Sequence, residues 1–579
     1  MRLKTKTADL VPAVGWIRSY SRAELKGDVN AGLTVGIMLI PQGMAYAVLA
    51  GLPPVYGLYS SIVPLILYAL FGTSRQLAVG PVAMISLLIV AGVGELAEAG
   101  SPRFIQLAVM TALGVGVLQL AMGILRMGFL VNFLSRPVLS GFTSAAALII
   151  GASQLKNLLG LDLPRTNHVH RIVMGVVRHA SEIDAVTTAI GVGSIVIIVA
   201  LRKWKPTLPS ALVVVVVGTL LTATLGLDER GVAIVGDIPT GLPSFQPVEL
   251  VFGDLRQLFP VILVIALVGY MESIAVAKAI AHKHNYQVDP NQELVGLGIA
   301  NIGGAFFQAY PVTGGFSRTA VNDQAGARSG MASLVSAGVI ALTVVFLTPY
   351  FYYLPMAVLA SVIIVAVAGL FELHEMKELW RTDRRDLAML AATFVATLAL
   401  GIEQGILVGV VLSLVVVIYS SARPHSTELG RLGSTTNFRN INRYPDARVH
   451  DDVLVYRFDS HLYFANVEFF REDIEDHISQ KGAPLEHVIL DASAMSSIDS
   501  TGVHALIQLI SDLTDRGIRF SIAGAVGPVR DRLARCGVVE AMGRESFWFD
   551  VSEAIASFKN EGEAEKRSHK RFSPLQSNV

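Results

Sequence analysis

Apolar segments of about 20 residues recur from Val29 to Tyr419, and this recurrence constrains the fold more than any other feature of the chain. The hydrocarbon core of a bilayer is about 30 Å thick, so one helical crossing needs roughly 20 apolar residues. Only 16% of the 579 residues are charged, whereas soluble domains carry about a quarter charged residues. The sequence therefore predicts an α-helical polytopic membrane domain.

We predict about 14 membrane spans, an even number that returns the chain to its starting side. The expected spans are 30–50, 55–72, 81–97, 104–125, 129–155, 184–201, 208–227, 258–281, 291–309, 315–326, 331–349, 354–371, 386–402 and 404–421. Basic residues gather in the turns that this count places in the cytoplasm, at Arg75, Arg126, Arg202, Lys203, Lys205, Lys283, Lys377, Arg381, Arg384 and Arg385. We therefore expect a multi-pass protein of a cell inner membrane with both termini in the cytoplasm.

One segment departs from this charge pattern. The stretch from Lys156 to Arg178 holds four Lys or Arg residues, although the count places it outside. The boundaries of the fifth and sixth spans are therefore left open.

The chain is expected to divide into five parts. The first 28 residues are basic and lack the apolar core of a signal peptide, so they should stay in the cytoplasm. After Ser421, alternating apolar runs predict strands interleaved with helices, which indicates a soluble α/β domain. The expected parts are 1–28 N-terminal segment, 29–421 transmembrane domain, 422–450 linker, 451–559 soluble domain and 560–579 disordered tail.

Pro and Gly interrupt two of the predicted spans. The third span starts at Gly80-Pro81, and the tenth follows the run from Tyr310 to Gly315. Broken backbone at membrane depth is tolerated where it lines a cavity, and paired breaks in corresponding halves mark the substrate site of an inverted-repeat transporter. A shift of seven spans is what two inverted seven-helix repeats give, with half-helices at spans three and ten.

Half-helices that begin at mid-membrane point positive dipole ends and unsatisfied N–H groups into a cavity. Ser317 adds a hydroxyl donor there, and Arg318 adds a fixed positive charge. The pattern predicts an anion as substrate rather than a cation. The alternative is an ordinary helix start with Arg318 reaching to the interface. The residues at the two ends are Gly80, Val82, Phe316, Ser317, Arg318 and Thr319.

Polar residues inside two other spans complete the candidate site. Gln42 and Tyr46 lie four apart on one face of the first span, where the amide can donate to an oxyanion or bond to another helix. Glu272 lies in the middle of the eighth span. A carboxylate there avoids its burial cost by protonation, by binding sodium or by pairing with Arg318. We favour a proton over sodium, because Val276 one turn on offers no side-chain oxygen.

These segments resemble the sulfate permease (SulP) family over almost the whole chain. The resemblance implies a core and a gate domain, a homodimer, and an elevator-like movement of the core. It also implies an anion site at Gln42, Tyr46, Val82, Phe316, Ser317 and Arg318, with Glu272 at the position linked to cation coupling. The motifs that carry it are Pro41-Gln42-Gly43-Met44-Ala45-Tyr46-Ala47, Pro53-Pro54-Val55-Tyr56-Gly57-Leu58-Tyr59, Gly72-Thr73-Ser74-Arg75, Val79-Gly80-Pro81, Glu272-Ser273-Ile274-Ala275 and Phe316-Ser317-Arg318-Thr319-Ala320-Val321-Asn322.

The soluble domain resembles the STAS domain through Asp499-Ser500-Thr501-Gly502. The resemblance implies that Ser500 is a phosphorylated switch that recruits a cytoplasmic regulatory protein. An Asp–Ser pair that caps a helix also explains these residues, and we favour this structural explanation.

The leading functional hypothesis is proton-coupled symport of sulfate, with bicarbonate, dicarboxylate or chloride transport as alternatives on the same scaffold. A nucleobase permease is disfavoured by Arg318. A membrane-tethered signalling receptor with output through the STAS domain is the alternative from another class. The net charge of zero and the single Cys536 argue against nucleic-acid binding, disulfides and cysteine-ligated metals. No enzyme activity and no cofactor are expected.

Overall fold

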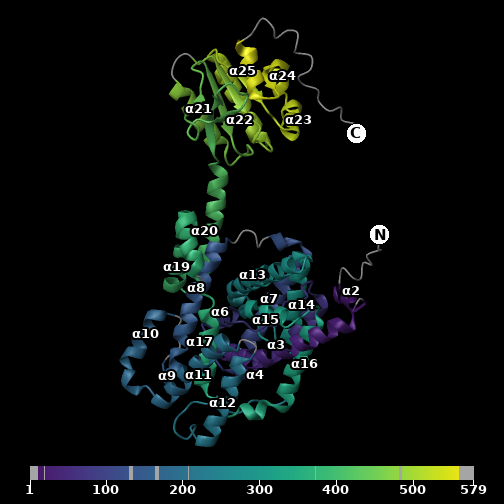
Figure 1. Ribbon diagram of the computed structural model, residues 1–579, viewed down its shortest axis with the longest axis vertical. Helices are drawn as coiled ribbons and strands as arrows, with labels where there is room; N and C mark the ends of the chain where they lie inside the picture. Colours follow the sequence, from purple (N-terminus) through teal and green to yellow (C-terminus); the bar gives the residue numbers. More distant parts are fainter. Residues whose placement is uncertain are drawn as a thin grey trace. The chain divides into compact units, whose positions relative to one another are not determined.

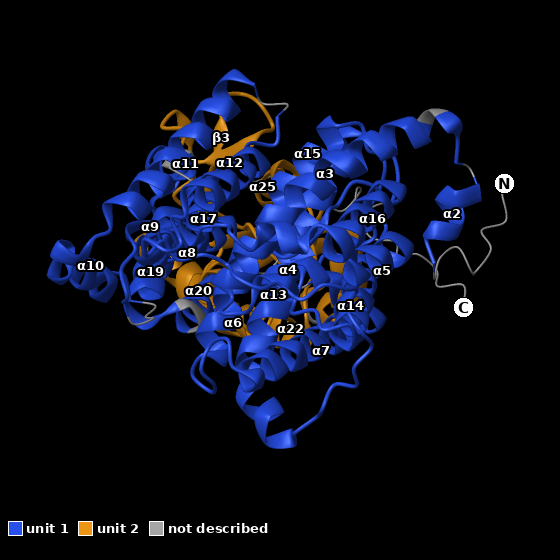
Figure 2. Ribbon diagram, turned by 90° about the horizontal axis from the view of Figure 1, so that it is seen from below, with its two compact units in different colours: residues 1–413 blue, residues 414–579 orange. Residues whose placement is uncertain are grey.

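The computed structural model describes residues 11–18, 20–129, 135–163, 168–205, 208–371, 373–481 and 485–559. The chain forms two compact units, residues Met1–Ser413 and Leu414–Val579, which Figure 2 shows in blue and orange. The predicted tail, 560–579, lies outside the described residues.

Each of the 14 predicted spans coincides with a helix or a helix pair in the described part of unit 1 and at its end (Figure 1). Seven helical stretches there are long and apolar enough to cross a membrane by themselves, and four more are apolar but shorter. The helices are α3 (Arg22–Leu49), α4 (Pro54–Tyr59), α5 (Val63–Phe71), α6 (Ala83–Val93), α7 (Pro102–Ile124), α8 (Arg136–Ser153), α11 (Ala185–Trp204), α12 (Ser210–Leu225), α13 (Phe252–Lys283), α14 (Pro290–Phe306), α15 (Phe316–Gln324), α16 (Met331–Phe346), α17 (Met356–Ala368), α19 (Arg384–Leu400) and α20 (Ile402–Ala422).

Several predicted boundaries differ from the structure, and three of the differences have a clear account. The second span is divided into α4 and α5, with Pro64 in the first turn of α5, where its missing N–H is tolerated. The fifth span begins at Arg136 rather than residue 129, and residues 130–134 lie outside the described chain. The first span begins at Arg22, because Ser21 and Glu24 form a capping box, so α3 includes the end of the predicted N-terminal segment.

Four short helices in the described part of unit 1 were not predicted as elements. Most are too short or too polar to show a span-length apolar signal. They are α2 (Ala13–Arg18), α9 (Leu155–Leu159), α10 (Val169–Arg178) and α18 (Leu373–Thr382). Two of them, α9 and α10, occupy the segment whose basic charge disagreed with the span count.

Helix packing in unit 1 repeats after seven spans. Helix α7, the fourth span, packs on α13 and α14, while α16, the eleventh span, packs on α3 and α5. In the same way α11 packs on α17, and α19 packs on α8. Each contact between a helix of the first half and a helix of the second half therefore has a counterpart, in which the equivalent helices of the opposite halves make the same contact. This reciprocity is the arrangement of two inverted seven-helix repeats.

Unit 2 is an α/β domain with its own core. One face of the sheet packs Leu454, Val488 and Ile522 against α21 to α23, while the other packs Val455 and Ile489 against α25. The strands are β3 (Ser426–Leu432), β4 (Phe438–Asn440), β5 (Ala447–Arg448), β6 (Val453–Phe458), β7 (His487–Asp491), β8 (Arg519–Ala523) and β9 (Phe547–Trp548). The helices are α21 (Val467–Lys481), α22 (Ser500–Asp515), α23 (Gly527–Arg535), α24 (Val538–Met542) and α25 (Val551–Lys559).

The sheet order in unit 2 is β4-β3-β6-β7-β8-β9, and β5 also pairs with β3. Strand β3 is antiparallel to β6, whereas β6 to β9 run parallel. The segment 422–450, expected to be a linker, therefore contributes three strands to the sheet. Its polar composition hid them, because β3 buries only some of its side chains.

Candidate anion-binding site

A two-stranded ribbon brings the two half-helices together. Strand β1 (Val79–Gly80) pairs antiparallel with β2 (Thr313–Gly314), so residues more than 230 apart become neighbours. Helix α6 begins at Ala83, just after β1, and α15 begins at Phe316, just after β2. Because the strands are antiparallel, the two helices leave the ribbon in opposite directions. Their N-termini therefore lie close together inside unit 1.

Both N-termini have N–H groups that no side chain caps. The N-cap residues are Val82 and Gly315, and neither makes a side-chain cap hydrogen bond. In the first helical hydrogen bonds, the N–H of Ser86 donates to the carbonyl of Val82 (3.0 Å) and the N–H of Thr319 donates to the carbonyl of Gly315 (3.0 Å). The preceding N–H groups lie outside the helical pattern, and the dipoles add positive potential. Such paired ends favour an anion.

The guanidinium of Arg318 lies over this ribbon. A Cβ added at Gly80 would lie 3.6 Å from Nη2 of Arg318, and one added at Gly315 would lie 2.8 Å from it. Gly80 also has φ +156°, a conformation that favours glycine. Glycine at both positions therefore makes room for the guanidinium.

Arg318 is almost fully buried, with 2% of its surface exposed. Its Nη1 donates to the carbonyl oxygen of Pro81. Its Nε and Nη2 are buried and have no hydrogen-bond partner among the described residues. A guanidinium keeps its charge in a protein interior, and unpaired buried donors are costly. An oxyanion beside Arg318 would satisfy both the charge and the donors.

The side chains predicted on α3 lie near this charge. Gln42 and Tyr46 are buried, with 4% and 6% of their surfaces exposed. Tyr46 is close enough to Arg318 to interact with it electrostatically. Oε1 of Gln42 has no hydrogen-bond partner among the described residues. This oxygen therefore does not make the hydrogen bond to another helix that was the alternative explanation for Gln42.

The other predicted residues at the half-helix ends differ in exposure. Val82 is buried, whereas Phe316 is 64% exposed and Ser317 is also exposed. The hydroxyl of Thr319 donates to the carbonyl of Gly315 (2.8 Å) and accepts from the N–H of Ala78 (3.1 Å). Thr319 thus joins α15 to the ribbon, and its hydroxyl is already engaged with backbone.

Glu272 lies on α13 and interacts electrostatically with Arg318. Within the described chain, the salt bridges closer than 4 Å do not include this pair. Oε2 of Glu272 is buried and has no hydrogen-bond partner among the described residues. The structure therefore does not contain the close Glu272–Arg318 ion pair that was one alternative.

Three polar residues that sequence reasoning did not assign hold β2 in place. The hydroxyl of Ser273 lies 2.6 Å from that of Thr313 and accepts from the N–H of Gly314 (2.8 Å). The amide of Asn301 accepts from the N–H of Val312 (2.8 Å) and donates to its carbonyl (3.1 Å). Their signal in the sequence was polarity within apolar spans, and Ser273 also directly follows Glu272.

Two buried carboxylates anchor the turns next to the half-helices. Glu293 accepts from the hydroxyl of Tyr68 (2.6 Å), from both the N–H and the hydroxyl of Thr73 (2.6 Å each) and from the N–H of Ser74 (3.0 Å). Asp28 accepts from the N–H of Arg328 (2.6 Å) and from the hydroxyl (2.6 Å) and N–H (3.1 Å) of Ser329. The first turn precedes β1 and the second follows α15. Neither carboxylate was predicted, because both partners are far away in sequence.

In unit 2, Ser500 is exposed at the first position of α22. Asp499 caps this helix by accepting from the N–H of Gly502 (2.7 Å) and also from that of Phe464 (3.0 Å). The capping explanation accounts for Asp499. Phosphorylation of Ser500 stays a prediction.

Comparison with known proteins identifies both units. Residues 25–393 match the model of the sulfate permease family, and residues 444–554 match the STAS domain. "Sulfate transporter 4.1, chloroplastic" of Arabidopsis thaliana is 41% identical over 96% of this chain and 83% of that protein. "Probable sulfate transporter MT1781" of Mycobacterium tuberculosis is 34% identical over 96% of this chain and 99% of that protein.

A solved structure has the same architecture. The murine solute carrier 26 family member A9 anion transporter, in the inward-facing state, matches with a TM-score of 0.89 and 28% identity. The match covers 97% of this chain and 96% of that one.

Proposed function

Because this chain belongs to the sulfate permease family, whose members are transporters rather than enzymes, we propose that it carries sulfate by proton-coupled symport. One observation supports an anion most directly. Arg318 is buried with a permanent charge and two unpartnered nitrogens, beside two helix N-termini. The names of the relatives support sulfate among the small anions.

The proposed site takes the oxyanion between the first turns of α6 and α15. Arg318 supplies positive charge, and the N–H groups after Val82 and Gly315 supply donors. Ser317 and the amide of Gln42 supply further donors, while Tyr46 and Phe316 form aromatic walls. Gly80 admits the guanidinium. Thr319 has a positioning role.

We further propose that the site moves as an elevator. The ribbon is fixed to α15 through Thr319, to α13 through Ser273 and to α14 through Asn301, and α15 packs on α3, so these elements would move as one body. Helices α8, α11, α17 and α19 pack mainly on one another and would form the static gate. The proposal includes a homodimer in a cell inner membrane, with both termini and the STAS domain in the cytoplasm.

Glu272 is the proposed coupling residue. The residue is half-buried and interacts with Arg318 electrostatically, and its buried Oε2 has no hydrogen-bond partner among the described residues. Protonation would remove a charge from the hydrocarbon and leave Arg318 attractive to the dianion. Proton binding at Glu272 would therefore favour sulfate binding at the neighbouring site.

The test is uptake of labelled sulfate into proteoliposomes under an inward proton gradient, an inward sodium gradient or neither. The unaltered chain should accumulate sulfate only with the proton gradient. Glu272→Gln should still exchange sulfate across the bilayer but lose the response to protons. Glu229→Gln, an exposed carboxylate in the loop after α12, is the matched control and should behave as the unaltered chain.

Competitors separate the transport alternatives. Bicarbonate, chloride and fumarate are added in excess, and each should reduce sulfate uptake only weakly. Accumulation of one of them in place of sulfate would replace sulfate as the substrate. A response to sodium instead of protons would reassign the coupling ion.

A further inference from the structure

The segment whose charge disagreed with the span count lines a cavity. The cavity has a volume of about 520 Å³ and is bordered by the C-terminal ends of α3, α6 and α8, by α9 and α10, and by the start of α17. By the span count, all of these ends lie on the membrane face opposite the N-terminus. That face is the outer one in the proposed orientation.

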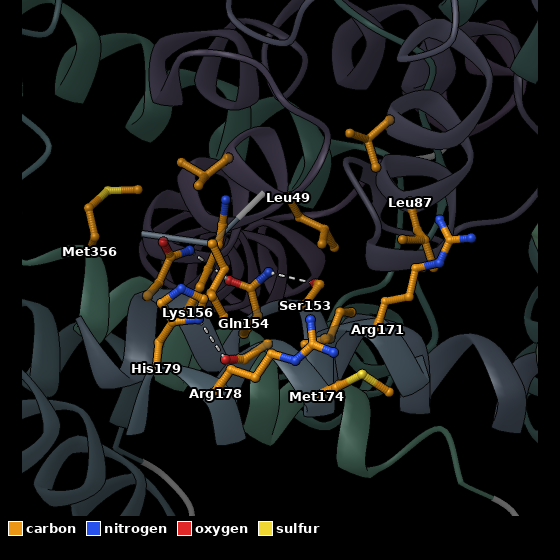
Figure 3. A pocket seen from close by; sticks show the side chains of 16 residues that line it. Leu49, Leu87, Ser153, Gln154, Lys156, Arg171, Met174, Arg178, His179 and Met356 are labelled. Atoms are coloured by element: carbon orange, nitrogen blue, oxygen red, sulfur yellow. Dashed lines mark hydrogen bonds between the residues drawn. The ribbon is translucent and has the colours of Figure 1, made fainter. Parts of the chain in front are cut away.

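The cavity is lined by both basic and apolar side chains (Figure 3). Lys156 extends from α9, and Arg171 and Arg178 extend from α10, while Leu49 and Leu87 come from α3 and α6. None of the 16 lining residues is an Asp or a Glu. Neither Arg171 nor Arg178 forms an ion pair with a carboxylate in the described chain. The cavity therefore carries positive charge that its own walls do not neutralise.

Helix α10 is built to hold this charge at a membrane surface. Arg171, Met174, Gly175 and Arg178 have helical spacing and all line the cavity. Val173 and Val177, on another face, are 47% and 69% exposed. A short helix with one basic and one exposed apolar face lies in the membrane interface.

Two apolar residues that line the cavity lie on the same helices as the central site. Leu87 follows the start of α6 by four residues, about 6 Å along a helix, and Leu49 follows Tyr46 by three residues, about 4.5 Å. The cavity thus lies about one helical turn beyond the anion site on the same helices. Leu49, Leu87 and Met356 all line the cavity.

We propose that this cavity, which we call the basic vestibule, binds the transported oxyanion on the outer face before it enters the central site. The inference rests on the proposed function. Positive charge along the rim of a cleft raises the local concentration of an anion and its association rate, and Arg171 and Arg178 are both exposed to solvent. The volume greatly exceeds the ~30 Å³ of one water molecule, so the anion enters with part of its hydration shell.

The test compares sulfate uptake from the two sides of the membrane. Intact cells report the KM for external sulfate, and inverted membrane vesicles report the KM from the cytoplasmic side. Arg171→Gln with Arg178→Gln should raise the external KM about tenfold at low salt, with the maximal rate and the cytoplasmic KM unchanged. The defect should shrink as the Debye length falls from about 30 Å at 0.01 M to about 10 Å at 0.1 M.

Two matched variants control for folding and for charge. Arg230→Gln removes an exposed arginine after α12, outside the vestibule, and should leave both KM values unchanged. Replacing Arg171 and Arg178 together by lysine keeps the charge and should restore most of the external affinity.

The same basic groups suit a phospholipid headgroup, so lipid composition is varied as well. A defect that vanishes in proteoliposomes without anionic lipid would assign the arginines to lipid and overturn the vestibule. An unchanged external KM in the glutamine variant would also overturn it, while leaving sulfate transport intact. If the unaltered chain took up no sulfate from either side, the proposed function itself would fail.

Discussion

The two half-helices start from one ribbon but present different chemistry in their first turns. The first turn of α6 is Ala83, Met84 and Ile85, all apolar and buried. The first turn of α15 is Phe316, Ser317 and Arg318, which combine an exposed ring, a hydroxyl and a buried guanidinium. The two ends are alike in their uncapped N–H groups and differ in their side chains.

This difference indicates a division of roles between the repeats. The end of α6 can act on an anion only through backbone N–H groups and its helix dipole. The end of α15 adds full charge and a second donor. In the proposed site, the two repeats would therefore supply a symmetric backbone cradle, and one repeat would supply most of the selectivity for charge.

Removing the charge of α15 should have the largest effect. Arg318→Gln should reduce kcat/KM for sulfate at least about 100-fold, because a charge-assisted hydrogen bond to a buried anion and its Coulomb attraction are both lost. Labelled uptake into proteoliposomes measures this change.

Arg318→Lys is the matched control for that experiment. Lysine keeps a point charge but lacks the fixed fork that reaches both Pro81 and the anion, so partial activity is expected. Full activity in the glutamine variant, with normal expression and thermal stability, would show that α15 does not dominate.

Breaking the anchors of the two ends should have the next largest effect, and here the ends should behave alike. Glu293→Gln leaves the N–H groups of Thr73 and Ser74 with a weaker acceptor on the α6 side. Asp28→Asn does the same to Arg328 and Ser329 on the α15 side. Each should destabilise the fold by about 2–3 kcal/mol.

Thermal unfolding in detergent, followed by size-exclusion chromatography, compares these two variants. Glu249→Gln is the control, because the carboxylate of Glu249 lies outside both anchors and accepts from the amide of Gln106. This variant should unfold at the same temperature as the unaltered chain. A large loss in only one of the two anchor variants would mean that the half-helices are held unequally.

The sequence predicted the helical spans and the two breaks because each rests on a local pattern. Apolar length marks a span, and Gly80-Pro81 marks a break. Arg318 could be singled out because a charge within an apolar segment is rare. The anchors could not be found this way, since Glu293 and Thr73 are 220 residues apart and Asp28 and Ser329 are 301 apart. Pairing at such separation depends on tertiary packing.

Two other differences have the same origin. Strand β3 was missed because Ser426 to Leu432 reads as polar linker until β6 pairs with it. Helix α10 was read only as a charge anomaly, because its ten residues are too short and too basic for a span. Only the structure shows that α10 lines a cavity together with residues of α3 and α6.

A smaller effect is expected from the hydroxyl at the α15 end. Ser317→Ala removes one neutral donor and leaves Arg318 and the backbone N–H groups intact. The KM for sulfate should rise about tenfold, equivalent to one hydrogen bond of about 1.4 kcal/mol, with kcat nearly unchanged. Ser317→Thr keeps the hydroxyl and should stay close to the unaltered chain.

The smallest effect should come from the α6 end, which makes it the sharpest test of the division of roles. Val82→Ala shortens the buried N-cap side chain but keeps the N–H groups that follow it, so the KM for sulfate should change less than about twofold. Stability should fall by about 1–2 kcal/mol for the lost packing, and this is measured separately by thermal unfolding. A rise in KM as large as that of Ser317→Ala, without a matching loss of stability, would mean that the side chain of Val82 shapes the anion site and that both repeats determine selectivity.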